Sequence, residues 1–112
     1  MDKISDIEEL IHGIKVKGEE FAKAKANRVY LEAYKSSLQA ILGSRIDGSQ
    51  AAKDSFARSS VEYIEHLGAL KAAVYLEERL KYELESITAR FEAWRTIQAT
   101  KRQELISLGN VT

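Results

Sequence analysis

The feature that most constrains the fold is a long stretch of sequence in which almost nothing stops a helix. The chain contains no proline, and between Ser49 and about Ser107 only Gly68 disfavours helical backbone. Apolar side chains recur along this stretch at helical spacing. The sequence therefore predicts a single long helix over about residues 50–107.

Two rows of a seven-residue repeat run along this predicted helix. One row reads Phe56, Tyr63, Leu70, Glu77, Leu84, Phe91, Gln98 and Leu105, and the other reads Ser59, His66, Ala73, Leu80, Ile87, Trp94 and Lys101. Because the second row follows the first by three residues, the two form one stripe, which we name the seam. We expect the core or an oligomer interface to be built from its apolar members Leu70, Leu80, Leu84, Ile87, Phe91 and Trp94.

The seam is less regular in the first half of this helix. There the neighbouring row, Ser60, Leu67 and Val74, carries more apolar side chains than Ser59 and His66. The pattern predicts that the apolar stripe shifts around the helix near residues 74–78. A long helix that drifts relative to a strict seven-residue repeat would explain the shift. A break near residues 75–79, which would give three helices, is the alternative.

A first helix precedes this one, over about residues 5–42. Ser5 and Glu8 have the spacing of a capping box at its start. The stretch GSRIDGS, residues 43–49, predicts the turn: Gly43 suits a left-handed helix end, and Asp47 or Ser49 can cap the next helix. We therefore expect an all-α fold, a single helical domain over residues 1–112 in which two long helices form an antiparallel hairpin.

A second apolar row predicts that this hairpin has a further neighbour. Val61, Tyr75 and Tyr82 lie at multiples of seven residues, in a row that also holds Gly68 and Ala89, away from the seam. A helix with two apolar faces usually packs between two neighbours. The second helix is also the longer, so part of its seam would be bare in a monomer. We expect a coiled-coil-like homo-oligomer, a dimer or tetramer; a compact monomeric three-helix bundle is the alternative.

Composition and motifs argue against several functional classes. Seventeen basic residues balance seventeen acidic ones, which disfavours bulk electrostatic binding to DNA. No cysteine is present, which excludes disulfides and thiolate chemistry. The sequence contains no phosphate-binding loop, nucleophile elbow or metalloprotease motif. We expect a protein without enzymatic activity or cofactor, not associated with a membrane, in the reducing environment of the cytoplasm.

Two polar groups within the second helix have ambiguous roles. Glu62, Glu65 and His66 could suggest a metal site, but the Glu-x-x-His spacing of helical metal sites fails because Tyr63 precedes His66 by three residues. We expect a hydrogen-bonded histidine and no metal. Glu77 occupies a seam position, where a polar residue usually sets register or partner number. Its candidate partners are Arg58, Arg79 and Lys81.

A short basic ridge lies near the end of the second helix. Arg95 and Arg102 are seven residues apart, and Lys101 adjoins Arg102. Cations are favoured near a helix C-terminus by the helix dipole, which gives the ridge a purely structural explanation. A nucleic-acid or partner-binding surface is the functional alternative. Trp94 falls on the seam, and we expect it to anchor the core or an interface.

The segment from Ser60 to Arg102 resembles a loose group of small all-helical bacteriophage proteins encoded in early, recombination-associated gene regions. The resemblance covers about residues 50–102. It rests on Tyr63, followed by Leu67 and Leu70, on the E-x-W-R segment from Glu92 to Arg95, and on the basic Arg102. It implies a phage origin, and therefore the cytoplasm of a bacterial host cell, and an accessory role in recombination or replication. It carries no catalytic residues.

We therefore expect a non-enzymatic phage or prophage accessory protein, an oligomeric helical scaffold that binds a protein partner or single-stranded nucleic acid. One alternative is a small inhibitor that blocks a host defence enzyme with a helical surface. Another is a structural coiled-coil adaptor.

Overall fold

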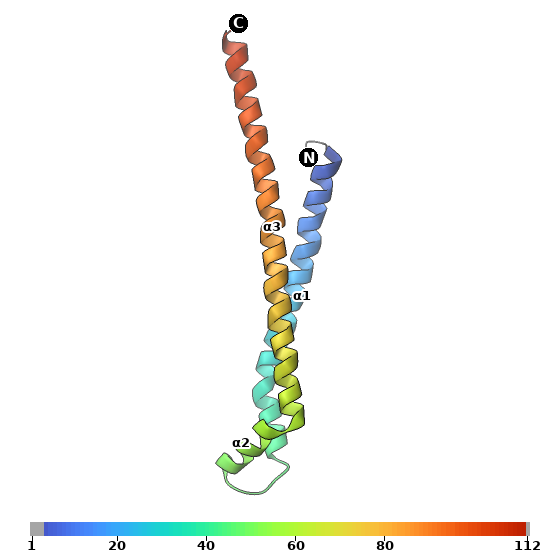
Figure 1. The fold of residues 1–112 in the computed structure, drawn as a ribbon, viewed down its shortest axis with the longest axis vertical. Coiled ribbons are helices and arrows are strands. Elements are labelled where there is room, and N and C mark those ends of the chain that lie inside the picture. Colours follow the sequence, from blue (N-terminus) through green and yellow to red (C-terminus); the bar gives the residue numbers. More distant parts are fainter. Residues whose placement is uncertain (1–3, 112) are drawn as a thin grey trace. The chain divides into compact units, whose positions relative to one another are not determined.

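The described part of the chain is entirely helical apart from its turns. The computed structural model describes residues 4–111, and the side chains of residues 6–109. Three helices follow one another: α1 (Ile4–Gly43), α2 (Gln50–Ser59) and α3 (Val61–Val111) (Figure 1). The predicted all-α fold is confirmed. Among the described residues, no helix has an apolar stretch of the length and character needed to cross a lipid bilayer.

The chain divides into two compact units. The corner unit comprises Glu20–Leu80, and the tail unit comprises Met1–Glu19 with Lys81–Thr112. In the corner unit Arg28 contacts Glu77 and Leu31 contacts His66, so α1 and α3 run antiparallel and form the predicted hairpin. In the tail unit Gly13 lies against Ile87 and Lys17 against Glu83, so these segments of α1 and α3 are antiparallel as well.

The hairpin is closed at its turn by a small core to which all three helices contribute. Leu42, Ala57 and Tyr63 are buried together, and Leu38 packs against them. Gly43 lies inside α1 and is not left-handed, contrary to the prediction; the one glycine with positive φ is Gly48. A Cβ on Gly43 would lie 3.2 Å from the Cβ of Lys53, so the close approach of α2 explains this glycine.

The helix ends differ in detail from those predicted. Ser49 caps α2, because its Oγ accepts a hydrogen bond from the backbone N–H of Ala52 at 3.2 Å. α1 begins at Ile4, so Ser5 lies inside the helix and not at its cap; its side chain is outside the described ones. α3 continues to Val111, beyond the predicted end near residue 107.

The second predicted helix is broken at Ser60 and not near residues 75–79. Ser60 has extended backbone (φ −70°, ψ 143°), which ends α2. Its carbonyl accepts the first hydrogen bond of α3, from the N–H of Ile64 at 3.1 Å. Both Ser59 and Ser60 donate their hydroxyls to the carbonyl of Phe56, the local competition by which serines disfavour a continuing helix. α3 is continuous through residues 75–79, so the alternative break there is wrong.

Burial along α3 follows the strict seven-residue repeat. In the corner unit, Ala73 is 6% exposed, whereas Leu67 and Val74 of the neighbouring row are 40% and 41% exposed. The predicted shift of the stripe is therefore wrong. In the tail unit the repeat continues through the partly buried Leu84, Ile87, Phe91 and Trp94. The strict repeat persists because α1 supplies partners for the polar seam residues.

Candidate protein-interaction surface

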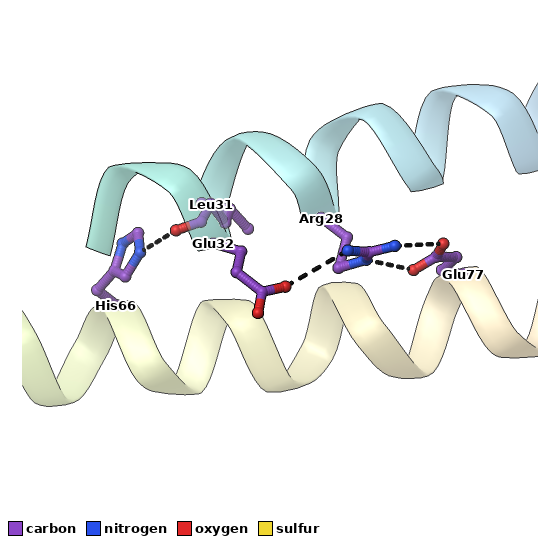
Figure 2. A network of polar contacts seen from close by, with 5 residues as sticks. All are labelled: Arg28, Leu31, Glu32, His66 and Glu77. Atoms are coloured by element: carbon purple, nitrogen blue, oxygen red, sulfur yellow. Dashed lines mark hydrogen bonds and ion pairs between the residues drawn. The ribbon is translucent and has the colours of Figure 1, made fainter. Parts of the chain in front are cut away.

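A bidentate ion pair holds the seam of the corner unit in register. The Arg28 guanidinium donates to both carboxylate oxygens of Glu77, at 2.7 and 3.1 Å, and to Glu32 at 3.4 Å (Figure 2). Glu77 is only 7% exposed. The hydrogen bond to Glu77 raises the pKa of Arg28 further above its ordinary value. Sliding α3 by one turn would separate a nearly buried carboxylate from this partner, which is costly.

Glu77 thus has the polar seam position that the sequence predicted, but with a different partner. The candidates Arg58, Arg79 and Lys81 come from its own half of the chain, whereas Arg28 precedes it by 49 residues. An equivalent pair joins the helices of the tail unit, where Lys17 Nζ lies 2.9 Å from Glu83 Oε2. In both units the basic residue lies on α1 and the acidic residue lies on α3. Both ion pairs thus join antiparallel segments of the same two helices.

His66 is a structural residue. Its Nε2 lies 2.6 Å from the carbonyl oxygen of Leu31, and we assign Nε2 as the protonated donor (Figure 2). The Tyr34 ring packs against it, with centroids 5.7 Å apart. Glu62 hydrogen-bonds Arg45, which lowers the pKa of Glu62. Among the described residues no group of three ligating side chains could hold a metal ion.

The second apolar row is exposed in the structure. In the corner unit Val61 is 63% and Tyr75 67% exposed; in the tail unit Tyr82 is 70% exposed. Ile64, which the sequence reading missed, is 57% exposed and belongs to the same face in the corner unit. We use the name outer face of α3 for the surface formed by Val61, Ile64, Leu67, Gly68, Lys71, Val74, Tyr75 and Glu78. They follow one another at helical spacing, roughly 140° around α3 from the seam.

A pair of exposed tyrosines marks a different surface of the corner unit. Tyr30 and Tyr34 stack on α1 with ring centroids 6.1 Å apart and an interplanar angle of 9°. Tyr30 is 64% exposed. The four-residue spacing of two aromatics could have suggested this pair, since such residues are neighbours on a helix surface.

The basic ridge lies on the exposed end of α3 in the tail unit. Arg95, Lys101 and Arg102 are all exposed. Arg95 is engaged by Glu92 of its own helix, at 3.2 and 3.3 Å, which reduces the positive charge that it can offer a ligand. Trp94 lies partly buried on the seam and stacks against Phe91 at 6.0 Å, as an anchor would. Beyond it, Leu105, Ile106 and Leu108 are mostly exposed.

Two kinds of feature stand out among the described residues: ion pairs across the seam and exposed apolar rows. Glu77 pairs with Arg28 in the corner unit and Glu83 pairs with Lys17 in the tail unit, whereas Val61, Tyr75, Tyr82 and the basic ridge are exposed. Comparison with known protein families, with curated proteins and with solved structures found no match to this chain.

Proposed function

We propose that this protein is a non-enzymatic helical scaffold that assembles with copies of itself and presents the assembly to a protein partner. The observation that supports this most is the outer face of α3. Three of its members, Val61, Ile64 and Tyr75, are each more than half exposed on a regular helix. The seam already provides the contact that holds α3 to α1, so this face is not needed for the hairpin.

Burial of such side chains would supply the free energy of association. Fully burying a valine, leucine, isoleucine or aromatic side chain contributes about 1.5–3 kcal/mol relative to leaving it in water. A row of several such residues along α3 is the kind of surface that helices bury against a further helix. Burial of this row against a second helix would therefore favour assembly.

The setting that we propose is recombination or replication in a bacteriophage or prophage. It comes from the resemblance of residues 50–102 to small helical phage proteins. The partner is a protein in this proposal, because the chain is neutral overall and Arg95 of the basic ridge is already paired. An inhibitor of a host enzyme would form one stable complex with that enzyme and would not depend on self-assembly.

The molar mass in solution tests the scaffold directly. Light scattering during gel filtration at micromolar concentration should give a multiple of the 12.6 kDa chain mass. A monomer under these conditions would contradict self-assembly. A labelled single-stranded DNA at low salt provides the second arm. Binding that is lost in the double variant Arg95→Glu, Arg102→Glu would contradict a purely protein-directed scaffold.

A further inference from the structure

We infer that α3 pairs with α3 of a second copy of this chain through the part of its outer face between Lys71 and Glu78, with the two helices antiparallel and crossing near Val74 and Tyr75. The inference rests on the proposed self-assembly and adds to it a surface, a partner and an orientation. The partner is a second copy because the face complements itself in charge as well as in apolar character.

The apolar part of the face is continuous in the corner unit. Val61, Ile64, Leu67, Val74 and Tyr75 span 15 residues of α3, with exposed fractions between 40% and 67%. At about 100° of rotation per residue these five side chains fall within roughly 140° of the helix circumference, which is less than half of it. The end of this stripe that holds Val74 and Tyr75 is where we centre the contact with a second copy.

Two opposite charges of the outer face lie on either side of Val74 and Tyr75. Lys71 precedes Val74 by three residues, and Glu78 follows Tyr75 by three. Both are exposed, and neither forms an ion pair with a residue in the described part of the chain. By contrast, Glu77 of the seam is paired with Arg28 of α1. Lys71 and Glu78 thus lack the kind of partner that Glu77 has.

An antiparallel second copy supplies those partners. A twofold axis between Val74 and Tyr75 places Lys71 of each copy opposite Glu78 of the other, because 71 and 78 lie equally far from the axis. A twofold interface repeats every contact, so two identical ion pairs flank an apolar centre made of two valines and two tyrosines. A parallel arrangement would instead place lysine against lysine and glutamate against glutamate, which is unfavourable.

A pair of exposed charges on α1 does not lie in such a stripe. On α1, Glu8 and Lys15 are also seven residues apart and exposed, with Ile11 between them and Glu9 and His12 beside it. This pair has the same charges and spacing without the apolar row. It therefore provides a matched control for effects of charge alone.

Charge reversal tests the inference. The dissociation constant of the assembly is measured by sedimentation for Lys71→Glu, for Glu78→Lys and for the double variant that carries both. Each single reversal puts two like-charged pairs at the interface, and we expect the dissociation constant to rise about tenfold. The double variant restores opposite charges in exchanged positions, so its dissociation constant should return close to that of the parent. Lys15→Glu should leave it unchanged, and circular dichroism establishes that each variant is folded.

The outcomes separate the interface from the scaffold. An assembling parent whose dissociation constant ignores both single reversals would overturn the proposed interface and leave the scaffold standing. Single variants that weaken assembly without rescue by the double variant would overturn the antiparallel pairing. A parent that is monomeric at micromolar concentration would overturn the scaffold and, with it, this interface.

Discussion

The two faces of α3 in the corner unit carry opposite combinations of side chains and environment. The seam buries an acidic residue, Glu77, at 7% exposure, whereas the outer face leaves Tyr75 67% exposed. Glu77 tolerates burial because α1 supplies Arg28 across the seam. Tyr75 has no such neighbour in the hairpin. A face of α3 can therefore bury a polar residue when a neighbouring helix supplies its partner. The outer face has no neighbouring helix among the described residues, so its apolar side chains stay exposed.

The largest effect should come from removing the most deeply buried side chain at the corner. Leu42 is fully buried and holds α2 to the hairpin. Leu42→Ala should lower the free energy of unfolding by about 3 kcal/mol, from lost burial and the cavity left behind. The adjacent Ile41, 49% exposed, gives the control. Chemical denaturation in which Ile41→Ala costs as much as Leu42→Ala would contradict the assignment of inside and outside.

Trp94→Ala tests whether the seam continues in the tail unit. Trp94 is partly buried and packs on Phe91, so the loss should be about 2 kcal/mol, below the 3–5 kcal/mol typical of fully buried aromatic residues. Thermal or chemical denaturation measures it. A variant that melts like the parent would show that Trp94 is free for a ligand.

Glycines sharpen the contrast between a contacted and an open helix face. A Cβ on Gly68 would meet no atom within 4 Å, whereas a Cβ on Gly13 would lie 2.5 Å from Cδ1 of Ile87. Gly68→Ala should therefore stabilise the chain by up to about 1 kcal/mol, the difference in helix propensity. Gly13→Ala should stabilise the chain less than Gly68→Ala, because the side chain of Ile87 must move to make room for the new Cβ. Equal gains in denaturation midpoint for the two variants would contradict the close packing at Gly13.

The smallest effect concerns an exposed ion pair near the corner. Arg45 lowers the pKa of Glu62, so the pair adds stability above the unfolded-state pKa of the carboxyl group and loses it as pH falls through the lowered pKa. Arg45→Gln should therefore lower the melting temperature slightly at neutral pH, and the difference from the parent should vanish in acid. A difference that grows on acidification would have the wrong sign for this pair.

Much of the fold could be predicted from the sequence, since it depends on local patterns. The absence of proline, the seven-residue rows and the glycine-rich turn determine the helices and the buried side of α3. The partner of Glu77 could not be predicted, because Arg28 lies 49 residues away and only the register of the two helices brings them together. The break at Ser60 was missed because serine also occurs inside helices, and only the structure shows that the hydroxyls of Ser59 and Ser60 both donate to the carbonyl of Phe56.

The candidate surface was partly predictable. The row of Val61, Tyr75 and Tyr82 is visible as a seven-residue repeat, and all three are exposed in the structure. Ile64 and the charges of Lys71 and Glu78 were missed, because their place on the outer face is clear only once the seam is known to keep one strict repeat. The apparent shift of the seam toward Leu67 and Val74 had assigned two outer-face residues to the inside.

The central claim is tested most directly by distances between two copies of α3. The chain has no cysteine, so Glu65→Cys or Ala72→Cys places one spin label on each copy at an exposed site beside the outer face. With antiparallel helices crossing near residues 74 and 75, pulsed electron paramagnetic resonance should give a label distance for Glu65→Cys roughly 15–20 Å longer than for Ala72→Cys, at a helical rise of about 1.5 Å per residue. Equal distances at the two sites, or no dipolar coupling between labels, would contradict the antiparallel assembly through this face.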